Sequence, residues 1–384
     1  MYNKKNIRLG VSVVCTLCTA LIIGGVIRSE KAQQTKQAFF EPEYMQMSEK
    51  ASIIASMLEK NYIEDFDDTE LSEKMYAAMT DAMDDPYTCY LTKEQMTAFT
   101  DDSSGRMSGI GVVIAEEDGH CVIKEVLEGS PAEKAGIKAG DIITEIGGTD
   151  VSGMPITEIS AMTKGVENTN VNISVMRGTK RLDFNVERKS IELKYVTGKC
   201  DGNIGYIKIT EFSQVAAEQF KTMLAGLEKQ NIKGLIIDLR NNPGGIIDVV
   251  AEIADTILPE GLITYTVDKY GNRRDILSAE GELDMPVAVL VNGGSASASE
   301  LLAGALQDRK KGIIIGTQTF GKGIVQGLYS LSDGSGLKIT IQKYYTPNGV
   351  CINGIGITPD YVIENDGNED LQYNKAMELL KTKD

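Results

Sequence analysis

The sequence has a single histidine, His120, which lies far upstream of its glycine-framed serine and lysine segments. A serine hydrolase needs a base beside its nucleophile, and that base is usually histidine. With its one histidine in a turn of a separate upstream module, the sequence argues against a Ser-His-Asp triad. A serine paired with a lysine is the simpler hypothesis, and we assign His120 no role.

Cysteine and proline are also scarce, with six and nine residues in the chain of 384. The cysteines outside the apolar amino-terminal segment are Cys89, Cys121, Cys200 and Cys351. They lack the Cys-x-x-Cys spacing of a metal site, and their pairing cannot be ranked from sequence. We therefore expect free thiols, no bound metal and no cofactor. The low proline content argues against long proline-rich linkers.

Positive charge is in deficit, because 39 lysines and arginines face 55 aspartates and glutamates, for a formal net charge of −16. This balance argues against a nucleic-acid partner and does not favour binding to anionic lipid surfaces. The length allows two or three domains after a non-globular start.

Charge of either sign is absent from Leu9–Ile27, a stretch of nineteen residues that follows Lys4, Lys5 and Arg8. Such a stretch is just long enough to span a bilayer, and the leading positive charges are expected to stay in the cytoplasm. We expect a single-pass anchor in a bacterial cell membrane, with the rest of the chain extracytoplasmic. The alternative is a signal peptide cleaved near Cys18–Ala20, which would leave a secreted protein.

A serine-rich turn, Asn292–Glu300, follows the apolar run Met285–Asn292 and precedes a helical pattern. The run predicts a buried parallel strand. A strand-turn-helix junction presents a hydroxyl at the carboxyl edge of a sheet, where the N–H groups of the first helical turn favour negative charge. Ser297 and Glu300 also match a capping box, in which the serine only closes the helix end. This turn alone leaves both interpretations open.

Lys322 lies between Gly321 and Gly323, after the apolar strand pattern Gly312–Gly316. The glycines leave room for another backbone to approach, so the amine can be partly desolvated, which favours its neutral form. An unperturbed lysine has a pKa of ~10.4, and lowering it to the range of roughly 7 to 8 useful for a base costs about 4 kcal/mol. Gln326 is a candidate to orient this amine.

The same region matches the glycine and lysine spacing of a phosphate-binding P-loop over Gly316–Gly323. However, Gly323 stands where that motif needs a serine or threonine to hold magnesium. The following stretch, Ile324–Tyr329, also has a strand pattern, whereas a P-loop opens onto a helix. We therefore reject the nucleotide-binding interpretation.

A third segment, Gly234–Arg240, has the pattern of a buried strand and ends in Asn241–Gly245 before a helical stretch. The paired glycines Gly244 and Gly245 can aim bare backbone N–H groups into a cleft, as an oxyanion hole requires. An ordinary tight turn is the alternative.

These three segments, in this order, resemble the carboxyl-terminal processing peptidases, also called tail-specific proteases. The similarity covers nearly everything after the amino-terminal anchor. The resemblance implies a serine endopeptidase in which Ser297 is the nucleophile, Lys322 is the general base and Gln326 orients the lysine.

The resemblance also implies an oxyanion hole made by the backbone N–H of Ala298 with that of Gly244 or Gly245. Asp308 matches an acidic position that some members need, where it either serves catalysis or supports the fold.

Upstream, Gly129–Ile143 resembles the signature of PDZ domains, which bind peptide tails as an added strand and capture the terminal carboxylate with loop N–H groups. The loop here would be Gly109, Ile110 and Gly111, leading into a strand from Val112. The implied partners are proteins or peptides with free carboxyl termini.

Two segments near the amino terminus, Tyr44–Leu58 and Asp68–Met83, have the apolar spacing of amphipathic helices. The resemblance implies that such helices support a homodimer. Near the other end, the acidic segment Glu364–Asp370 is expected to be a solvated linker before a last helix, Leu371–Leu380.

We therefore expect a multidomain fold of mixed α+β and α/β class, with a crotonase-like serine protease core, an inserted PDZ domain and amino-terminal helices. The expected parts are an anchor (1–28), a helical region (29–103), the PDZ domain (104–188), the protease core and cap (189–363) and a tail (364–384). The alternatives are an inactive PDZ-bearing binding protein and a relative of the acyl-CoA hydratases or thioesterases, which would share the oxyanion architecture but explain neither the anchor nor the PDZ stretch.

Overall fold

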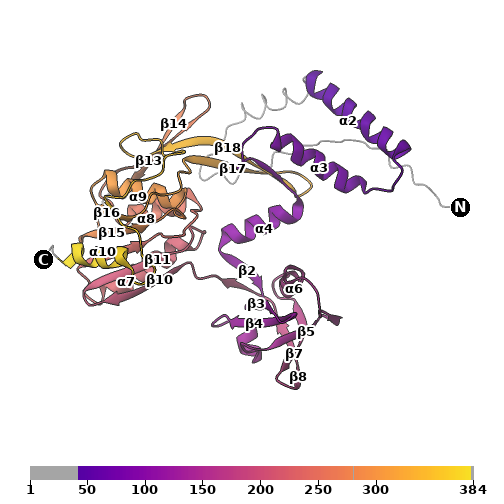
Figure 1. The fold of residues 1–384 in the computed structure, drawn as a ribbon, viewed down its shortest axis with the longest axis horizontal. Helices are drawn as coiled ribbons and strands as arrows, with labels where there is room; N and C mark the ends of the chain where they lie inside the picture. The colour runs from indigo at the N-terminus through magenta and orange to yellow at the C-terminus, as the bar shows by residue number, and fades with distance from the viewer. Residues whose placement is uncertain (1–41, 280, 382–384) are drawn as a thin grey trace. The chain divides into compact units, whose positions relative to one another are not determined.

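The computed structural model describes residues 42–279 and 281–381. The chain divides into two compact units (Figure 1). Of the described residues, the first unit holds 42–97 together with Val325–Gln342, and the second holds the others. Within the described ranges, no helix combines the length and the apolar character needed to cross a membrane. The expected anchor, Leu9–Ile27, lies outside the described residues.

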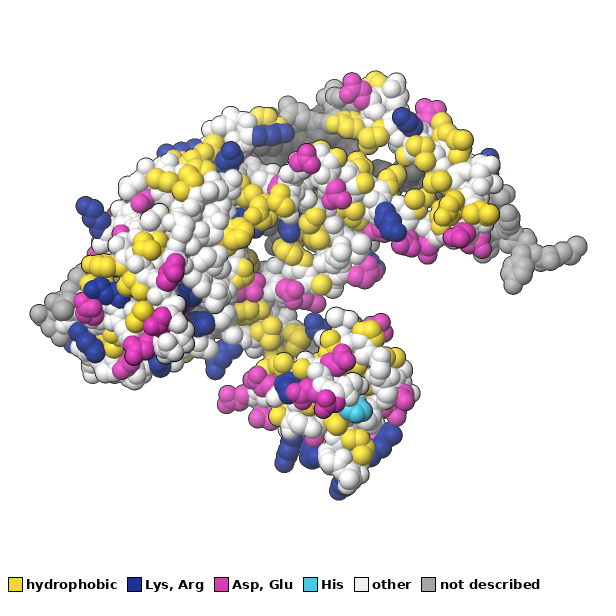
Figure 2. Space-filling view, in the orientation of Figure 1, with side chains coloured by type: hydrophobic (Ala, Val, Ile, Leu, Met, Phe, Trp, Pro, Cys, Tyr) yellow, Lys and Arg dark blue, Asp and Glu magenta, His cyan; other side chains and the backbone are white. Residues whose placement is uncertain are grey.

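The first unit begins with two helices, α2 (Pro42–Asn61) and α3 (Asp68–Asp81), which confirm the two predicted amphipathic segments. Helix α3 starts at Asp67, whose carboxylate accepts hydrogen bonds from two backbone N–H groups of the first turn. No residue of α2 is buried, and Figure 2 shows apolar side chains gathered over this helix.

The first unit also holds β1 (Cys89–Leu91), most of β17 (Ile324–Ser330) and β18 (Gly336–Tyr345) as far as Gln342. The last three residues of β18, Lys343–Tyr345, belong to the second unit. Strand β1 pairs with β18 in antiparallel register, with Tyr90 opposite Leu337. Helix α4 (Lys93–Ser104) follows β1 along the chain.

The predicted PDZ stretch, in the second unit, contains a six-stranded antiparallel sheet. Its order is β3 (Val112–Glu117), β4 (His120–Val126), β5 (Ile142–Ile146), β7 (Asn170–Arg177) and β8 (Lys180–Glu187), with the short β6 (Thr149–Asp150) paired to β5. Two short helices, α5 (Pro131–Ala135) and α6 (Ile156–Thr163), pack on it around a core that includes Ile110, Ile123, Ile143 and Val175. A two-stranded ribbon, β2 (Arg106–Gly109) with β9 (Lys189–Glu192), joins the two ends of this module.

A six-stranded sheet forms the centre of the rest of the second unit. Its order is β10 (Val196–Asp201), β11 (Ile204–Ile209), β12 (Gly234–Asp238), β15 (Val287–Val291), β16 (Gly312–Gly316) and β19 (Tyr361–Val362). Only the β10–β11 pair is antiparallel. Strands β12 and β15 are buried along their whole length, as their continuous apolar sequences predict for strands covered on both faces.

Helices cover both faces of this sheet. On one face, α10 (Leu371–Lys381) packs Ala376, Met377 and Leu380 against alternate residues of the central strands. The helices α7 (Ala216–Glu228), α8 (Ile247–Asp255) and α9 (Ala298–Asp308) pack against one another, and α7 and α9 also contact the strands. The antiparallel strands β13 (Gly261–Asp268) and β14 (Arg273–Ser278) lie beside α8.

Candidate active site

The three segments singled out from sequence follow three neighbouring parallel strands. The loop with Gly244 follows β12, the turn with Ser297 follows β15, and the loop with Lys322 follows β16. Because the carboxyl ends of adjacent parallel strands meet at one edge of the sheet, the topology brings these loops together. This edge is where ligand sites of parallel sheets usually lie.

Ser297 has an unusual backbone conformation, with φ of 54° and ψ of −113°. Asp67 and Ser130, whose side chains cap α3 and α5, are extended, with ψ of 118° and 161°. The Glu300 half of the capping box is formed, because Ser297 N donates to Glu300 Oε2 at 2.8 Å. However, a positive φ strains a non-glycine residue and is not needed for a cap. The capping interpretation therefore does not account for the geometry of Ser297, which is also partly exposed.

The two flanking serines differ from Ser297 because both are fully buried and hydrogen-bonded. Ser295 Oγ donates to the carbonyl of Leu239 at 2.8 Å, and Ser299 Oγ donates to the carbonyl of Asn242 at 2.9 Å. Both bonds tie the serine turn to the loop after β12. These two hydroxyls are therefore structural.

The backbone of Gly244 lies directly against Ser297. A Cβ placed on this glycine would be 2.8 Å from Ser297 Cβ and 3.0 Å from Ala298 N, so no larger residue fits. Its N–H donates to the side-chain oxygen of Asn242 at 2.8 Å. Within the described part of the chain, the N–H groups of Gly245 and Ala298 donate to no protein acceptor. Of the two glycines, Gly245 is therefore the one with an N–H still available.

The two glycines beside Lys322 allow the segment after β18 to approach closely. A Cβ on Gly323 would lie 2.4 Å from Asn353 N, and one on Gly321, where φ is 89°, would lie 3.0 Å from Ile355 N. The prediction that these glycines admit another backbone is confirmed. Lys322 itself is partly buried by this arrangement.

A buried carboxylate, that of Glu300, joins the serine turn to the lysine loop. Its Oε2 accepts from Ser297 N at 2.8 Å and from Lys322 N at 2.9 Å. Its Oε1 accepts from Gly321 N and from Thr319 Oγ1, both at 2.6 Å. Sequence analysis treated Glu300 only as a capping partner, because a local pattern carries no sign of contacts with residues about twenty positions away.

Two other predicted site residues, Gln326 and Asp308, make side-chain contacts of their own. Gln326 belongs to β17 in the first unit, where its side-chain amide lies 3.4 Å from Thr340 Oγ1. Asp308 ends α9, and its carboxylate accepts a hydrogen bond from Asn348 N at 2.8 Å. This contact gives Asp308 a structural bond to the turn after β18.

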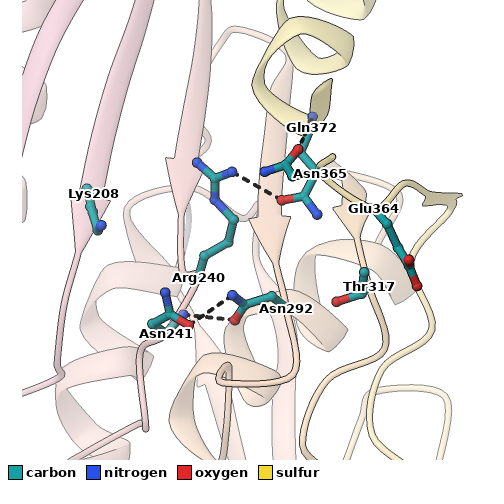
Figure 3. Close-up of a pocket in the computed structure, with 8 residues that line it drawn as sticks. All are labelled: Lys208, Arg240, Asn241, Asn292, Thr317, Glu364, Asn365 and Gln372. Atoms are coloured by element: carbon teal, nitrogen blue, oxygen red, sulfur yellow. Dashed lines mark hydrogen bonds between the residues drawn. The ribbon is translucent and has the colours of Figure 1, made fainter. Parts of the chain in front are cut away.

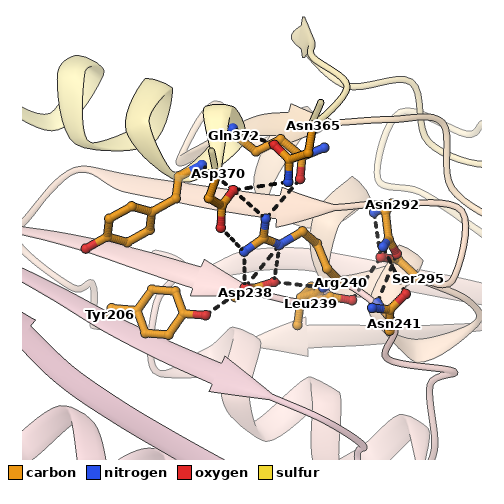
Figure 4. A network of polar contacts seen from close by, with 11 residues as sticks. Tyr206, Asp238, Leu239, Arg240, Asn241, Asn292, Ser295, Asn365, Asp370 and Gln372 are labelled. Carbon is orange, nitrogen blue, oxygen red and sulfur yellow. Dashed lines mark hydrogen bonds and ion pairs between the residues drawn. The ribbon is translucent and has the colours of Figure 1, made fainter. Parts of the chain in front are cut away.

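An ion-pair network lies just ahead of the glycine loop (Figure 4). Arg240 binds the buried carboxylate of Asp238 at 2.6 Å and that of Asp370 at 2.7 Å, and Asp238 also accepts from Tyr206 Oη at 2.7 Å. The acidic segment predicted to be only a solvated linker is therefore anchored at its last residue. Burial, together with the adjacent Asp238 carboxylate, raises the pKa of Tyr206 well above its ordinary value, so this hydroxyl keeps its proton.

A polar cavity of about 460 Å³ opens beside this network (Figure 3). Its walls come from the carboxyl ends of the parallel strands and from the tail, namely Lys208, Arg240, Asn241, Asn292, Thr317, Glu364, Asn365 and Gln372. Asn292 Oδ1 accepts from Asn241 N at 2.9 Å, and its amide donates to Asn241 Oδ1 at 2.9 Å. The cavity wall thus cross-links the glycine loop with the serine turn, although neither Ser297 nor Lys322 lines the cavity.

The predicted tail-binding loop has free donors at an open sheet edge. The carbonyls of Ile110 and Gly111 accept from Ala132 N at 2.8 Å and Leu127 N at 3.0 Å. By contrast, across the residues described, the N–H groups of Ile110 and Gly111 donate to nothing in the protein. Strand β3, which starts at Val112, is the last strand of its sheet, and α6 packs beside it.

Neither the histidine nor any of the four cysteines belongs to this loop. His120 is exposed at the start of β4. The four cysteines that the structure describes are free thiols, and burial raises the pKa of Cys121 to about 11, which makes this thiol unreactive.

Comparisons with known proteins place the chain in a family. The sequence profile described as Peptidase family S41 matches residues 203–363, and that described as PDZ domain matches residues 99–176. A carboxyl-terminal-processing protease of Synechocystis sp. is 37% identical over 329 residues, which cover 80% of this chain and 77% of that protein.

Two further matches also cover about four fifths of this chain. A probable CtpA-like serine protease of Staphylococcus aureus is 36% identical over 315 residues, covering 81% of this chain, and the chain spans 64% of the length of that relative. The solved structure of a photosystem II D1 C-terminal processing protease is 31% identical, with coverage of 82% of this chain and 86% of that one and a TM-score of 0.49. By its sequence identity over most of its length, the chain belongs to peptidase family S41 and carries a PDZ domain.

Proposed function

We propose that this chain is a serine endopeptidase in which Ser297 is the nucleophile and Lys322 is the general base. The observation that carries the proposal is the strained backbone of Ser297, at the amino end of α9, bonded through Glu300 to the loop of Lys322. Backbone strain at a strand-to-helix turn is typical of catalytic nucleophiles. A serine that served only as a helix cap would not need it.

In the proposed reaction, Ser297 Oγ attacks the carbonyl carbon of the scissile peptide bond, and its proton passes to the neutral amine of Lys322. The negative charge that develops on the carbonyl oxygen is stabilised by the N–H groups of Ala298 and Gly245 at the amino end of α9. The C–N bond then breaks, and the leaving amine takes the proton from Lys322. Water, deprotonated by the same lysine, releases the acyl product and restores Ser297.

We assign substrate selection to the PDZ module. The unbonded N–H groups of Ile110 and Gly111 suit capture of a terminal carboxylate, while the free edge of β3 suits addition of the preceding residues as a strand. Gly109 and Val112 flank this loop and complete the proposed site. The proposed substrates are proteins with accessible, unstructured carboxyl-terminal tails.

The remaining assignments belong to the same proposal. Gln326 orients Lys322, Asp308 supports the end of α9, and the catalytic sheet with its flanking helices has a crotonase-like arrangement. The domain limits are those expected from sequence, with the PDZ domain at 104–188 and the protease core at 189–363. An amino-terminal anchor holds the catalytic part outside the cytoplasm, and α2 and α3, with their exposed apolar residues, support a homodimer.

The test compares hydrolysis of casein, an unstructured protein, by the full-length chain and five variants. Ser297→Ala and Lys322→Ala should each lower turnover by several orders of magnitude, and the double variant should be little worse, because the two groups act as a unit. Ser299→Ala removes one hydrogen bond, whereas Ser295→Ala removes two, because Ser295 Oγ donates to Leu239 O and accepts from Asn292 N. These variants should cost about 1 and about 2 kcal/mol of stability and keep turnover within tenfold.

Comparing the variants of the three serines in this turn distinguishes the proposed nucleophile, Ser297, from the structural Ser295 and Ser299. Circular dichroism of each variant checks that it is folded. Near-normal turnover by a folded Ser297→Ala protein would overturn the proposal and would leave the chain as a PDZ-bearing binding protein.

A further inference from the structure

Tyr344, a residue that sequence analysis did not single out, touches both proposed catalytic loops. It lies near the end of β18 and is 1% exposed. Its hydroxyl is hydrogen-bonded to the backbone carbonyl of Ser297 at 2.8 Å and to that of Lys322. Its own N–H donates to the carbonyl of Gly323 at 3.1 Å. Tyr344 therefore binds the lysine loop at two consecutive carbonyls and the serine turn at one.

Glu300 and Tyr344 hold the same two residues by opposite backbone groups. Glu300 accepts from the N–H groups of Ser297 and Lys322, whereas Tyr344 binds their carbonyls. Both side chains are buried, so water does not compete for these bonds. Glu300 thus restrains the peptide group before each Cα, and Tyr344 restrains the peptide group after the Cα of the residue to which its hydroxyl donates. These bonds limit the directions in which the proposed catalytic side chains leave the backbone.

The hydroxyl of Tyr344 is suited to this task because it keeps its proton. Burial raises the pKa of Tyr344 well above its ordinary value, and the nearby negative charge of Glu300 adds to the effect. A hydroxyl has one proton, so it donates to one carbonyl at a time. The Ser297 carbonyl also accepts from Leu301 N at 3.0 Å, within α9, and this bond would remain without Tyr344.

We propose that Tyr344 is a positioning residue for the Ser297–Lys322 pair, which holds the lysine loop against the serine turn from the side opposite Glu300. The inference rests on the proposed function, because it assigns Tyr344 a role only if these two residues carry the reaction. It concerns the alignment of the two side chains and not the binding of substrate. Misplacement of a catalytic group by about 1 Å can lower a rate by roughly a hundredfold.

The test replaces Tyr344 with phenylalanine, which keeps the ring contacts and removes only the hydroxyl. For the full-length Tyr344→Phe chain acting on a quenched fluorescent peptide, kcat should fall about ten- to a hundredfold while KM stays within twofold. Tyr345→Phe is the matched control, because Tyr345 is the next residue and stacks on Tyr265 away from both loops. Its kcat and KM should equal those of the unmodified chain.

A second measurement distinguishes partial unfolding of Tyr344→Phe from a loss of reactivity at Ser297. A fluorophosphonate probe, which modifies activated serines, labels the folded molecules, so the amplitude of labelling gives the folded fraction and the rate constant gives the reactivity of Ser297. The inference expects a labelling rate constant at least tenfold lower than that of Tyr345→Phe. An unchanged rate constant or an unchanged kcat for Tyr344→Phe would overturn it.

Ser297→Ala, run in parallel, separates this inference from the proposed function. If Ser297→Ala cuts the peptide as the unmodified chain does, the proposed function fails and the inference fails with it. If Ser297→Ala is inactive while Tyr344→Phe matches the control, only the inference fails.

Discussion

At the scale of single residues, buried charges in this chain are held by several hydrogen bonds each. Asp141 in the PDZ module has a side chain that is 1% exposed and forms an ion pair with Arg177 at 2.7 Å. It also accepts from Lys138 N at 2.9 Å. Burial alone would raise the pKa of Asp141, but the bonds from Arg177 and Lys138 outweigh it and hold the pKa below its ordinary value.

This shift predicts how the stability of the PDZ module depends on pH. Because the folded state lowers the pKa of Asp141 below the unfolded value of ~3.9, the stabilisation is fully present above about pH 4. It is lost as the pH falls through the folded pKa. Asp141→Asn should therefore cost roughly 2 kcal/mol at pH 7, and its deficit relative to the unmodified chain should shrink in strong acid.

Scanning calorimetry of the two full-length proteins between pH 7 and pH 2.5 measures this difference. A deficit that stays constant across the range would show that Asp141 contributes through packing and not through its charge.

At the scale of elements, the loop before β3 decides how a tail would bind. The carbonyls of this loop face inward and are bonded, which leaves the N–H groups of Ile110 and Gly111 for a ligand. Gly111 has φ of 82°, and a Cβ there would lie 2.4 Å from Ser130 Cβ. Substituting Gly111 would therefore disturb Ser130, the cap of α5, and change the fold together with the site. Changing the ligand is the cleaner experiment.

We expect a peptide with a free carboxyl terminus to bind the Ser297→Ala chain about ten- to a hundredfold more tightly than the same peptide with an amidated terminus. The reason is that amidation removes the charge-assisted hydrogen bonds from the loop N–H groups. Fluorescence anisotropy of the labelled peptide measures both affinities without cleavage. Equal dissociation constants would mean that the PDZ module does not recognise the carboxyl terminus.

At the scale of the whole molecule, the segment before α10 is tied to the six-stranded sheet. Arg240, which immediately precedes the glycine loop, binds Asp238 in β12 and Asp370 at the start of α10. Asp238 is 1% exposed, whereas the side chain of Asp370 is 43% exposed. Water can therefore replace a lost partner of Asp370 more readily than a lost partner of Asp238.

Arg240→Ala should destabilise the protein by roughly 3 to 5 kcal/mol, because it leaves the carboxylate of Asp238 buried without its cation. Asp370→Asn should cost about 1 kcal/mol or less, since water screens this end of the network. Urea unfolding of the full-length variants measures both losses. Equal losses would show that the tail contact, and not the buried pair, carries the stability.

Local patterns were sufficient for several of the helices and strands. The apolar runs predicted strands β12, β15 and β16, and the periodic segments predicted helices α2, α3, α9 and α10, all of which the structure contains. These predictions succeeded because burial on two faces of a strand, or on one face of a helix, leaves a repeating signal in neighbouring residues. The resemblance to a known family, carried by three short motifs, likewise needed no structure.

Contacts between distant segments could not be derived in this way. Glu300 had the spacing of a helix cap, and only the structure shows that its carboxylate also binds the backbone of the lysine loop. Tyr344 occupied an unremarked strand position, and its hydroxyl meets the carbonyls of two residues that lie 47 and 22 positions away.

The sequence by itself determined the strands that precede the three motifs, several of the helices and the residue types available for a serine–lysine reaction, because those follow from local periodicity and short motifs. The tertiary structure decided which serine of the turn has a strained backbone, which serines have hydrogen-bonded hydroxyls, and which of the two glycines, Gly244 or Gly245, keeps a free N–H. It also decided which buried side chains join the two loops. The physical reason is that strain and hydrogen-bond satisfaction depend on which groups meet in space, and parallel strands bring together residues whose separation along the chain carries no signal.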